Sequence, residues 1–544
     1  MSRTLRRAAA LLVACLLLAA SSVSPASATT YAQIEGSGST WSQVIVTQWI
    51  SDVDSAGMKV TYNGSGSSQG RKDFANGVTD FGISEIPYQG RDENGNADTN
   101  NGRDFAYLPI VAGGTAFTYQ LKVAGKRVKN LRLSGDTLAK IFTNKITKWN
   151  DPAISKDNNG ASFPALPITP VVRSDGSGTT AQFTRYLDTM YPSLWRPYFG
   201  HSGLTSYFPK KGRMIAAAGS DQVMNTISGA AGNGTIGYVE YSYPVNAHYP
   251  VVKVLNQGGY FVEPTQYNVA VALTQARINQ DKSSQNYLTQ VLDGVYRATD
   301  PRAYPLSSYS YMIIPTGATD RRMTTAKRQT LADFMYYSLC EGQSKAGAYG
   351  YSPLPLNLVQ AGFQQLAKLK QADGNVDLTN RDVTKCHNPT FVAGHLTQNH
   401  LAQIAPRPAT CDKAGHGPCG GATGTGTPST DANQKSTTPT AASTTTAATA
   451  ATGSAAGGTP STAAAGGTTT GAATAVDPET GQAVAGADPA LAGQPINPVA
   501  TELASSRPGD SSMFGLLAVL ELVALVVLPG LYVAVRRRRS GGAA

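Results

Sequence analysis

The sequence predicts an α/β protein of two lobes, followed by a long linker and one membrane-spanning helix. Strand-like runs alternate with helical ones between about residues 31 and 408, which is enough chain for two lobes. Within that region a Gly/Ser/Thr-rich loop joins a strand to an amphipathic helix three times. Apolar segments stand near both ends of the chain.

The three loops carry the clearest chemical information, and they are residues 36–41, 64–70 and 173–180. A helix N-terminus presents unpaired N–H groups, glycine lets the backbone approach a ligand, and hydroxyl groups add donors. Three such ends directed at one place would bind an anion with little net positive charge. The alternative is three ordinary turns before capped helices. None of the loops ends in the Gly-Lys-Ser/Thr of a nucleotide-binding P-loop.

Charged residues beside the loops favour an anion site over ordinary turns. Arg173 opens the third loop, and its guanidinium can direct two hydrogen bonds at one oxyanion. Asp175 follows two residues later, where its carboxylate can orient that guanidinium. A second carboxylate, Glu85, ends the run of residues 80–85.

A hydrolase is the main alternative among enzymes. Residues 66–70 match the G-x-S-x-G pattern that places a nucleophilic serine on a sharp turn. That chemistry also needs a base, and only His201 and His248 lie in the middle of the folded region, with no motif around them. The sequence therefore predicts a protein that is not an enzyme, with no catalytic residue, metal site or cofactor.

The two ends of the chain predict an exported protein that is anchored in the cell membrane. Residues 1–28 have the basic start, apolar run and small-residue cleavage site of a signal peptide. Residues 513–535 contain a single charge, Glu521, and are long enough to span a bilayer core of about 30 Å. The tail of residues 536–544 begins with four arginines, which places it in the cytoplasm and the lobes outside.

Composition and charge define the remaining organisation. Residues 409–512 are rich in Ala, Thr, Gly and Ser, so we expect a disordered linker that cannot bury a core. Setting aside three arginines of the signal peptide and four of the tail reduces the formal net charge from +10 to +3. No basic stripe of the kind that nucleic-acid binding needs remains, so no nucleic-acid partner is expected.

Four cysteines remain once the signal peptide is removed, and an even number in an exported chain favours disulfides. Pairing neighbours along the chain predicts the bridges Cys340–Cys386 and Cys411–Cys419. A metal site with His387 and His416 is the alternative, although the spacing matches no zinc pattern.

Taken together and in order, six segments resemble the phosphate-binding proteins of bacterial phosphate ABC transporters. The segments are residues 36–41, 62–70, 80–87, 173–180, 234–241 and 351–355. The resemblance implies a periplasmic-binding-protein fold, similar to type II, in which two lobes close on one buried phosphate. We expect the chain to cross between the lobes within residues 107–119, which contain Gly113 and Gly114.

The resemblance also implies which residues contact the phosphate: Thr40, Trp41, Ser67, Glu85, Arg173, Ser177, Gly178 and Thr179. Family members often carry another aromatic residue in place of Trp41, and a backbone N–H contact would survive that change. Glu85 falls where the family has an aspartate that accepts a hydrogen bond from the phosphate's own proton. The change from aspartate to Glu85 affects the expected specificity for phosphate more than the expected fold.

The expected function is an extracellular, membrane-anchored receptor that captures inorganic phosphate and delivers it to an ABC permease, acting as a monomer. Two other functions remain open at this point. One is a surface hydrolase of phosphate or acyl esters, and the other is a surface interaction protein that retains the binding-protein fold.

Overall fold

The computed structural model describes residues 31–92, 95–395 and 397–427. The predicted signal peptide, membrane span and basic tail lie outside these ranges, as does most of the predicted linker. Within the described ranges, no helix combines the length and the apolar character needed to cross a bilayer.

A mixed sheet of eight strands runs through the molecule, in the order β11-β10-β12-β6-β17-β3-β1-β2. Strand β1 is parallel to β2 and β3, and β10 is parallel to β11 and β12, whereas β6 is antiparallel to its neighbours β12 and β17. The strands are β1 Ile34–Gly38, β2 Val60–Asn63, β3 Phe81–Ser84, β6 Phe105–Gln120, β10 Thr169–Arg173, β11 Ile215–Ala217, β12 Thr235–Glu240 and β17 Ser307–Pro315.

Strand β6 belongs to both halves of this sheet. Its first part pairs with β17 as far as Gly114, and its second part pairs with β12 from Thr115 onward. We call the β2-β1-β3-β17 side the first lobe and the β12-β10-β11 side the second lobe. The predicted crossing within residues 107–119 is therefore confirmed.

Two glycines allow close packing at the crossing point. A Cβ atom on Gly113 would lie 2.7 Å from the Trp41 ring, and one on Gly114 would lie 2.3 Å from Cβ of Pro264. Real side-chain atoms do not approach so closely, so larger residues would push the neighbouring chain away from β6.

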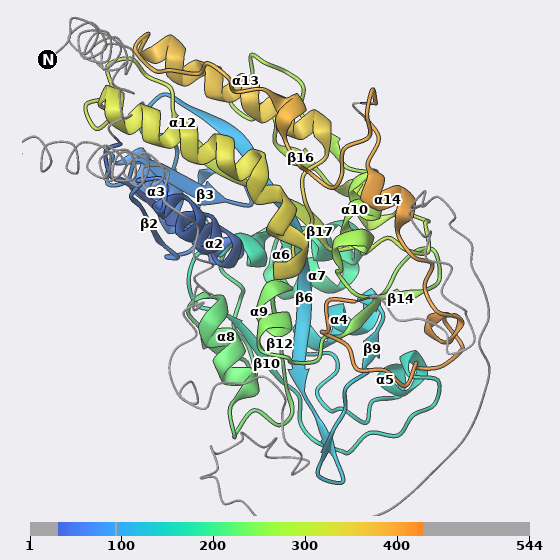
Figure 1. Cartoon of the computed structure of the whole chain (residues 1–544). Coiled ribbons are helices and arrows are strands. Elements are labelled where there is room, and N and C mark those ends of the chain that lie inside the picture. The colour runs from blue at the N-terminus through green and yellow to red at the C-terminus, as the bar shows by residue number, and fades with distance from the viewer. Residues whose placement is uncertain (1–30, 93–94, 396, 428–544) are drawn as a thin grey trace, which may run out of the picture. The chain divides into compact units, whose positions relative to one another are not determined.

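Helices cover the sheet in both lobes (Figure 1). Their apolar faces are buried, as in the helix over residues 43–54, where Ile45, Trp49 and Val53 recur at intervals of four. The first lobe carries α2 Gln43–Asp54, α3 Ser67–Ala75, α12 Thr325–Leu339, the 3-10 segment Glu341–Tyr349 and α13 Leu356–Ala372. The remaining helices are α4 Gly135–Phe142, α5 Pro152–Asp157, α6 Gly178–Met190, α7 Pro192–Phe199, α8 Gly219–Ser228, α9 Ser242–Asn246, α10 Gln266–Leu273, α11 Asp293–Tyr296 and α14 His400–Ile404.

Short strands complete the fold. Strands β9, β13 and β14 form a three-stranded sheet, and the others form two-stranded ribbons. Their bounds are β4 Gly90–Arg91, β5 Ala97–Asp98, β7 Lys122–Val123, β8 Lys126–Arg127, β9 Arg132–Leu133, β13 Lys253–Leu255, β14 Phe261–Val262, β15 Arg277–Ile278 and β16 Gln290–Val291.

Residues 373–427 form a C-terminal strap that contacts both lobes. On the first lobe, Arg381 pairs with Asp333 of α12. In the middle, α14 packs against α10. On the second lobe, Nη1 of Arg132 donates to the carbonyl of Cys411 at 2.9 Å. The strap also contains the 3-10 segments Val383–Lys385 and Thr410–Asp412.

The folded region continues past the expected boundary at Pro408. Asp412 forms a buried ion pair with Lys253 of β13 at 2.6 Å. The Thr423 hydroxyl donates to the carbonyl of Val251 at 2.6 Å, and the Gly424 N–H donates to Glu263. Residues 409–427, expected to begin a disordered linker, are instead held by polar contacts, which a prediction based on apolar burial does not detect.

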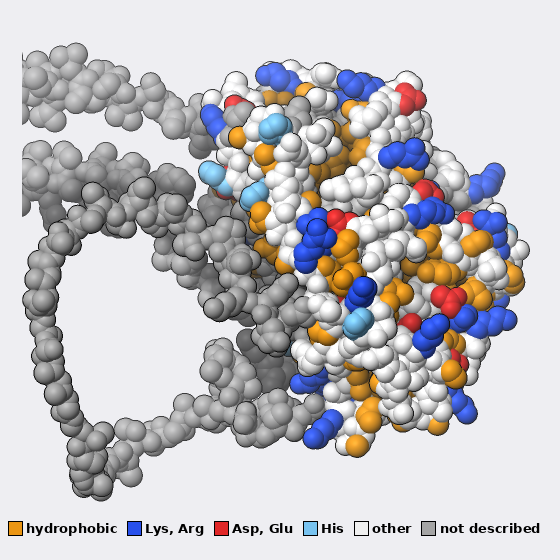
Figure 2. Space-filling view, turned by 90° about the vertical axis from the view of Figure 1, so that its right-hand side faces the viewer, with side chains coloured by type: hydrophobic (Ala, Val, Ile, Leu, Met, Phe, Trp, Pro, Cys, Tyr) orange, Lys and Arg blue, Asp and Glu red, His pale blue; other side chains and the backbone are white. Residues whose placement is uncertain are grey.

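Both predicted disulfides are confirmed. Cys340–Cys386 joins the strap to the end of α12, and Cys411–Cys419 closes a short loop within the strap. On the face drawn in Figure 2, Lys and Arg side chains are spread among uncharged and acidic ones.

Candidate functional site

The three predicted loops meet at the seam between the lobes. Across the seam, the Gly178 N–H donates to the Ser67 hydroxyl at 3.0 Å, and the Ser68 N–H donates to the Gly176 carbonyl at 3.0 Å. The Thr40 hydroxyl lies 3.0 Å from the Ser220 hydroxyl. The structure therefore brings residues from all three loops into one buried polar cluster.

All the predicted contact residues are buried in this cluster: Thr40, Trp41, Ser67, Glu85, Arg173, Ser177, Gly178 and Thr179. Burying this many polar groups is costly unless they are hydrogen-bonded or face a ligand. Contacts across the seam join Thr40 to Ser220 and Ser67 to Gly178, so the structure is that of closed lobes.

Glycines make the loops possible. Gly38 and Gly66 have φ values of +136° and +94°, a region that favours glycine. A Cβ atom on Gly38 would lie 2.2 Å from the Ile83 carbonyl oxygen, and one on Gly66 would lie 2.6 Å from Asp175. The chain therefore turns tightly from β1 and β2 into the helices that follow.

Arg173, at the end of β10, is held by Asp175. Its Nε donates to Oδ1 of Asp175 at 2.7 Å, and its Nη2 donates to Oδ2. Its Nη1 reaches the Ser220 hydroxyl at 3.4 Å. This is the orienting contact that the sequence predicted, and it fixes the plane of the guanidinium at the seam.

The same contacts set the charge of Asp175. Burial is the largest single effect and favours the neutral form, but the hydrogen bonds and charge of Arg173 and the Gly219 N–H together outweigh it. The net result lowers the pKa of Asp175, so the carboxylate stays ionised beside the guanidinium.

Glu85 points into the cluster and forms no ion pair with a described residue. Its Oε2 accepts from the Ser67 hydroxyl at 2.7 Å, and its Oε1 accepts from the Ser310 hydroxyl at 3.0 Å. Burial raises the pKa of Glu85, and the hydrogen bonds from Ser39, Ser67 and Ser310 offset only part of that shift. Glu85 is therefore a carboxyl group at the seam that is surrounded by hydroxyls and has no counter-ion within the described part of the chain.

Trp41 and Thr179 differ in how far their polar groups are already hydrogen-bonded. The Trp41 N–H is already bonded to the Ser39 hydroxyl at 3.0 Å, and its ring packs edge-on against Tyr351. The Thr179 hydroxyl, in the first turn of α6, is fully buried and has no hydrogen-bond partner in the described part of the chain. A buried hydroxyl of that kind is free to bind a ligand.

The sequence analysis missed a fourth helix end at the same place. The Gly219 N–H, at the start of α8, donates to Asp175 at 2.9 Å, and the Ser220 N–H donates to the Thr40 hydroxyl at 3.3 Å. Residues 215–221 run from a strand through Gly-Ser into a helix, so the signal was present but short. Ser310 and Tyr243, whose hydroxyl donates to the Thr40 carbonyl, carried no local signal.

The serine and histidine residues considered for a hydrolase are not bonded to each other in the described part of the chain. The Ser68 hydroxyl, at the centre of the G-x-S-x-G match, accepts from Arg71 at 3.4 Å. Nδ1 of His201 contacts the Ser202 carbonyl at 2.9 Å. Among the described residues, no group of three His, Cys, Asp or Glu side chains is placed to hold a metal ion.

Comparison with known proteins identifies the family to which this chain belongs. A family model described as a PBP superfamily domain matches residues 23–341. The phosphate-binding protein PstS of Methanocaldococcus jannaschii is 30% identical over 348 residues, which cover 62% of this chain and 86% of that protein. This chain belongs to the substrate-binding proteins of phosphate ABC transporters.

Other members of the family show similar overlap. Phosphate-binding protein PstS 3 of Mycobacterium tuberculosis is 33% identical over 327 residues, covering 59% of this chain and 82% of that protein. A solved phosphate-binding protein from Stenotrophomonas maltophilia has a TM-score of 0.46 and 16% identity, with 61% of this chain and 92% of that chain covered. The strap of this binding protein lies beyond the residues that the family model matches.

Gly178 should be essential for closure of this binding protein. A Cβ atom there would lie 2.0 Å from Oε2 of Glu85 and 2.6 Å from the Ser67 hydroxyl. We expect Gly178→Ala to destabilise the closed arrangement by about 1–3 kcal/mol, the usual cost of overpacking. Small-angle X-ray scattering with phosphate present should show a larger radius of gyration. Gly374→Ala, where the new atom meets open space, is the control, and equal profiles for both variants would contradict the prediction.

Proposed function

We propose that this protein is an extracellular receptor that binds inorganic phosphate between its two lobes and passes it to an ABC permease. The observation that carries the proposal is the meeting of four helix N-termini with Arg173 and Glu85 in one buried cluster. Donors with little net charge suit a small, strongly hydrated oxyanion, because the anion exchanges its water for fixed N–H and O–H groups.

Different residues of the cluster supply the charge and the hydrogen-bond donors for the phosphate. Arg173, held by Asp175, supplies charge and N–H donors to the phosphate oxygens. The first N–H groups of α6, at Gly178 and Thr179, and the hydroxyls of Thr40, Ser67, Ser177 and Thr179 supply the remaining donors. The Thr40 hydroxyl contacts the Ser220 hydroxyl across the seam, and the Ser67 hydroxyl accepts from the Gly178 N–H. These groups exchange those bonds for phosphate oxygens when the ligand binds. Trp41 contributes through its backbone N–H.

Glu85 supplies the acceptor. Near neutral pH inorganic phosphate still carries at least one proton, whereas sulfate carries none. An ionised carboxylate accepts a hydrogen bond from the phosphate proton and repels a fully ionised anion, so it discriminates by leaving charges unpaired. The extra methylene relative to aspartate is accommodated by the hydroxyls of Ser67 and Ser310, which hold the carboxylate at the seam.

The remaining parts of the chain complete the proposal. A signal peptide exports the protein, and residues 513–535 anchor it in the cell membrane with the lobes outside. The receptor acts as a monomer and needs no cofactor. Lobe closure about β6 captures the ligand, as hinge motions do in binding proteins.

Removing the Arg173 guanidinium should weaken phosphate binding strongly. Loss of one partner of a buried, hydrogen-bonded charge pair costs about 2–5 kcal/mol, so we expect Arg173→Ala to raise the dissociation constant at least about 30-fold. Isothermal titration with phosphate measures the effect. Arg196→Ala, which removes a surface guanidinium that is 51% exposed, is the control and should change little. Near-normal affinity in Arg173→Ala would exclude this residue from the site.

Replacing Glu85 tests the origin of specificity. Glu85→Gln places an N–H donor where the acceptor was, so we expect weaker phosphate binding and a smaller preference for phosphate over sulfate. Competition titrations with both anions measure the preference. Glu35→Gln, which alters an exposed carboxylate of β1, is the matched control.

Lowering the pH should reduce the preference of the parent protein for phosphate over sulfate, as Glu85→Gln does. Because burial raises the pKa of Glu85, lowering the pH through that pKa protonates the carboxyl group and removes the acceptor. The preference over sulfate should therefore fall as the pH falls in the parent and stay constant in Glu85→Gln. A fall of the same size in Glu85→Gln as in the parent would contradict the role of Glu85.

Removing the predicted anchor should release the receptor. A chain that ends before residue 513 lacks the apolar segment, so we expect it in the culture medium, with unchanged affinity for phosphate. Cell fractionation followed by immunoblotting compares it with the full chain. Retention of the shortened chain in the membrane fraction would contradict anchoring by this segment.

A further inference from the structure

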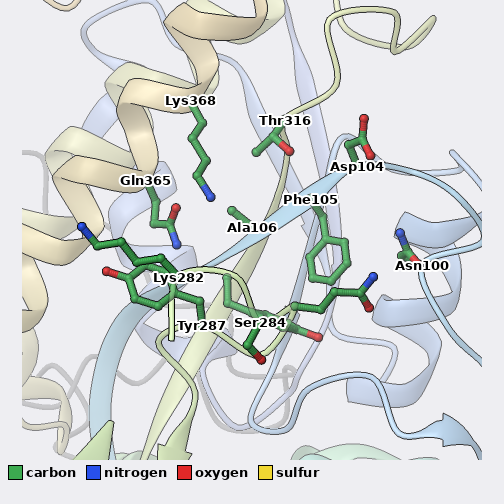
Figure 3. A pocket seen from close by; sticks show the side chains of 12 residues that line it. Asn100, Asp104, Phe105, Ala106, Lys282, Ser284, Tyr287, Thr316, Gln365 and Lys368 are labelled. Atoms are coloured by element: carbon green, nitrogen blue, oxygen red, sulfur yellow. The ribbon is translucent and has the colours of Figure 1, made fainter. Parts of the chain in front are cut away.

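A second pocket lies in the first lobe, away from the seam. It has a volume of about 240 Å³ and is lined by the start of β6, helix α13 and the loop that joins β15 to β16 (Figure 3). Ala106 and Thr316 place it at the end of β6 and β17 opposite the crossing at Gly113 and Gly114. It shares no residue with the polar cluster at the seam.

Two polar side chains of α13 enter this pocket without partners. Gln365 is 2% exposed, and within the described ranges its amide makes no hydrogen bond although it is directed into the pocket (Figure 3). One turn later, the amine of Lys368 is directed into the same space and forms no ion pair with a described residue. Buried polar groups in native proteins normally have a partner.

The charge of Lys368 indicates that a ligand bound beside it and Gln365 would be an anion. Burial lowers the pKa of Lys368, because no nearby carboxylate compensates for the loss of water around its ammonium group. Lys282, from the opposite loop, also lines the pocket, but it is exposed and its amine is directed away from Asp104, so Lys368 is the cation that enters the pocket (Figure 3). Asp104 is an exposed side chain on the other side of the pocket from Gln365, and its carboxylate has no partner in the described part of the chain (Figure 3).

The size and walls of the pocket define the ligand further. Its volume is below the 300–1,000 Å³ typical of sites for drug-sized molecules, so the ligand is small. Polar side chains make up most of the lining, and the rings of Phe105, Tyr107 and Tyr287 form the apolar part, against which a short carbon skeleton can pack. An acceptor at Asp104 requires a donor on the ligand.

We propose that this pocket binds a small organic carboxylate that also carries a hydroxyl or amino group. The carboxylate bonds to Lys368 and Gln365, and the hydroxyl or amino group donates to Asp104. The proposal is independent of phosphate binding at the seam, since none of its residues belongs to the polar cluster.

Titrations of the full chain with phosphate at saturation test the proposal, because the seam is then occupied. The probes are L-malate and L-aspartate, which carry the required donor, and succinate, which lacks it. We expect malate or aspartate to bind with a dissociation constant of about 1 mM or below and succinate to bind more weakly. Lys368→Met keeps the shape of the side chain and should weaken binding about 10-fold or more, as expected for loss of one charged hydrogen bond. Lys370→Met, an exposed lysine of the same helix outside the pocket, should not change it.

Asp104→Asn tests the second contact, because it should reduce the preference for malate or aspartate over succinate. Circular dichroism and a phosphate titration establish that each variant is folded. No binding of malate or aspartate up to about 10 mM, ten times the expected constant, would overturn the proposal. So would equal binding in Lys368→Met and Lys370→Met. If phosphate does not bind at the seam, the proposed function fails, and the comparison of Lys368→Met with Lys370→Met still tests this pocket, because both variants leave the seam unchanged.

Discussion

Strand β6 is the constraint on which the arrangement of both lobes depends. A single strand of 16 residues exchanges hydrogen bonds with β17 on one half and with β12 on the other, so it joins the strands of the two lobes into one sheet. Because the partner changes between Gly114 and Thr115, the two halves of the sheet meet at one place. The carboxyl ends of β1, β2, β10 and β11 then lead into helices whose N-termini face a common seam, where α/β proteins generally bind ligands.

Electrostatics at this seam depend on dipoles and hydroxyls more than on net charge. Arg173 is the one guanidinium among the predicted contact residues, and Asp175 already balances its charge. The other donors are backbone N–H groups and hydroxyls, which can rearrange between partners at little cost. Glu85 adds a carboxyl group that has no counter-ion among the described residues, and burial raises its pKa although the surrounding hydroxyls offset part of the shift.

The strap changes how this binding protein is held together. It starts on α12, passes α10 beside the crossing and ends on β13 and β9, so one continuous segment contacts both lobes. A disulfide joins it to the end of α12, and a buried ion pair secures its far end. The strap lies beyond the region that the family model matches, which ends at residue 341.

The sequence by itself determined the local parts of this protein: the α/β alternation, the strand crossing at Gly113-Gly114, the glycine-rich turns before three helices, the pairing of Arg173 with Asp175 and both disulfides. Each depends on residues close together in the chain or on the order of several motifs. Only the tertiary structure decided the contacts across the seam. Ser220 meets Thr40 across 180 residues, and Ser310 meets Glu85 across 225. It also decided the attachment of residues 409–427 and the pocket around Lys368. Such contacts depend on how elements distant in sequence pack around β6, and a local sequence pattern does not predict that packing.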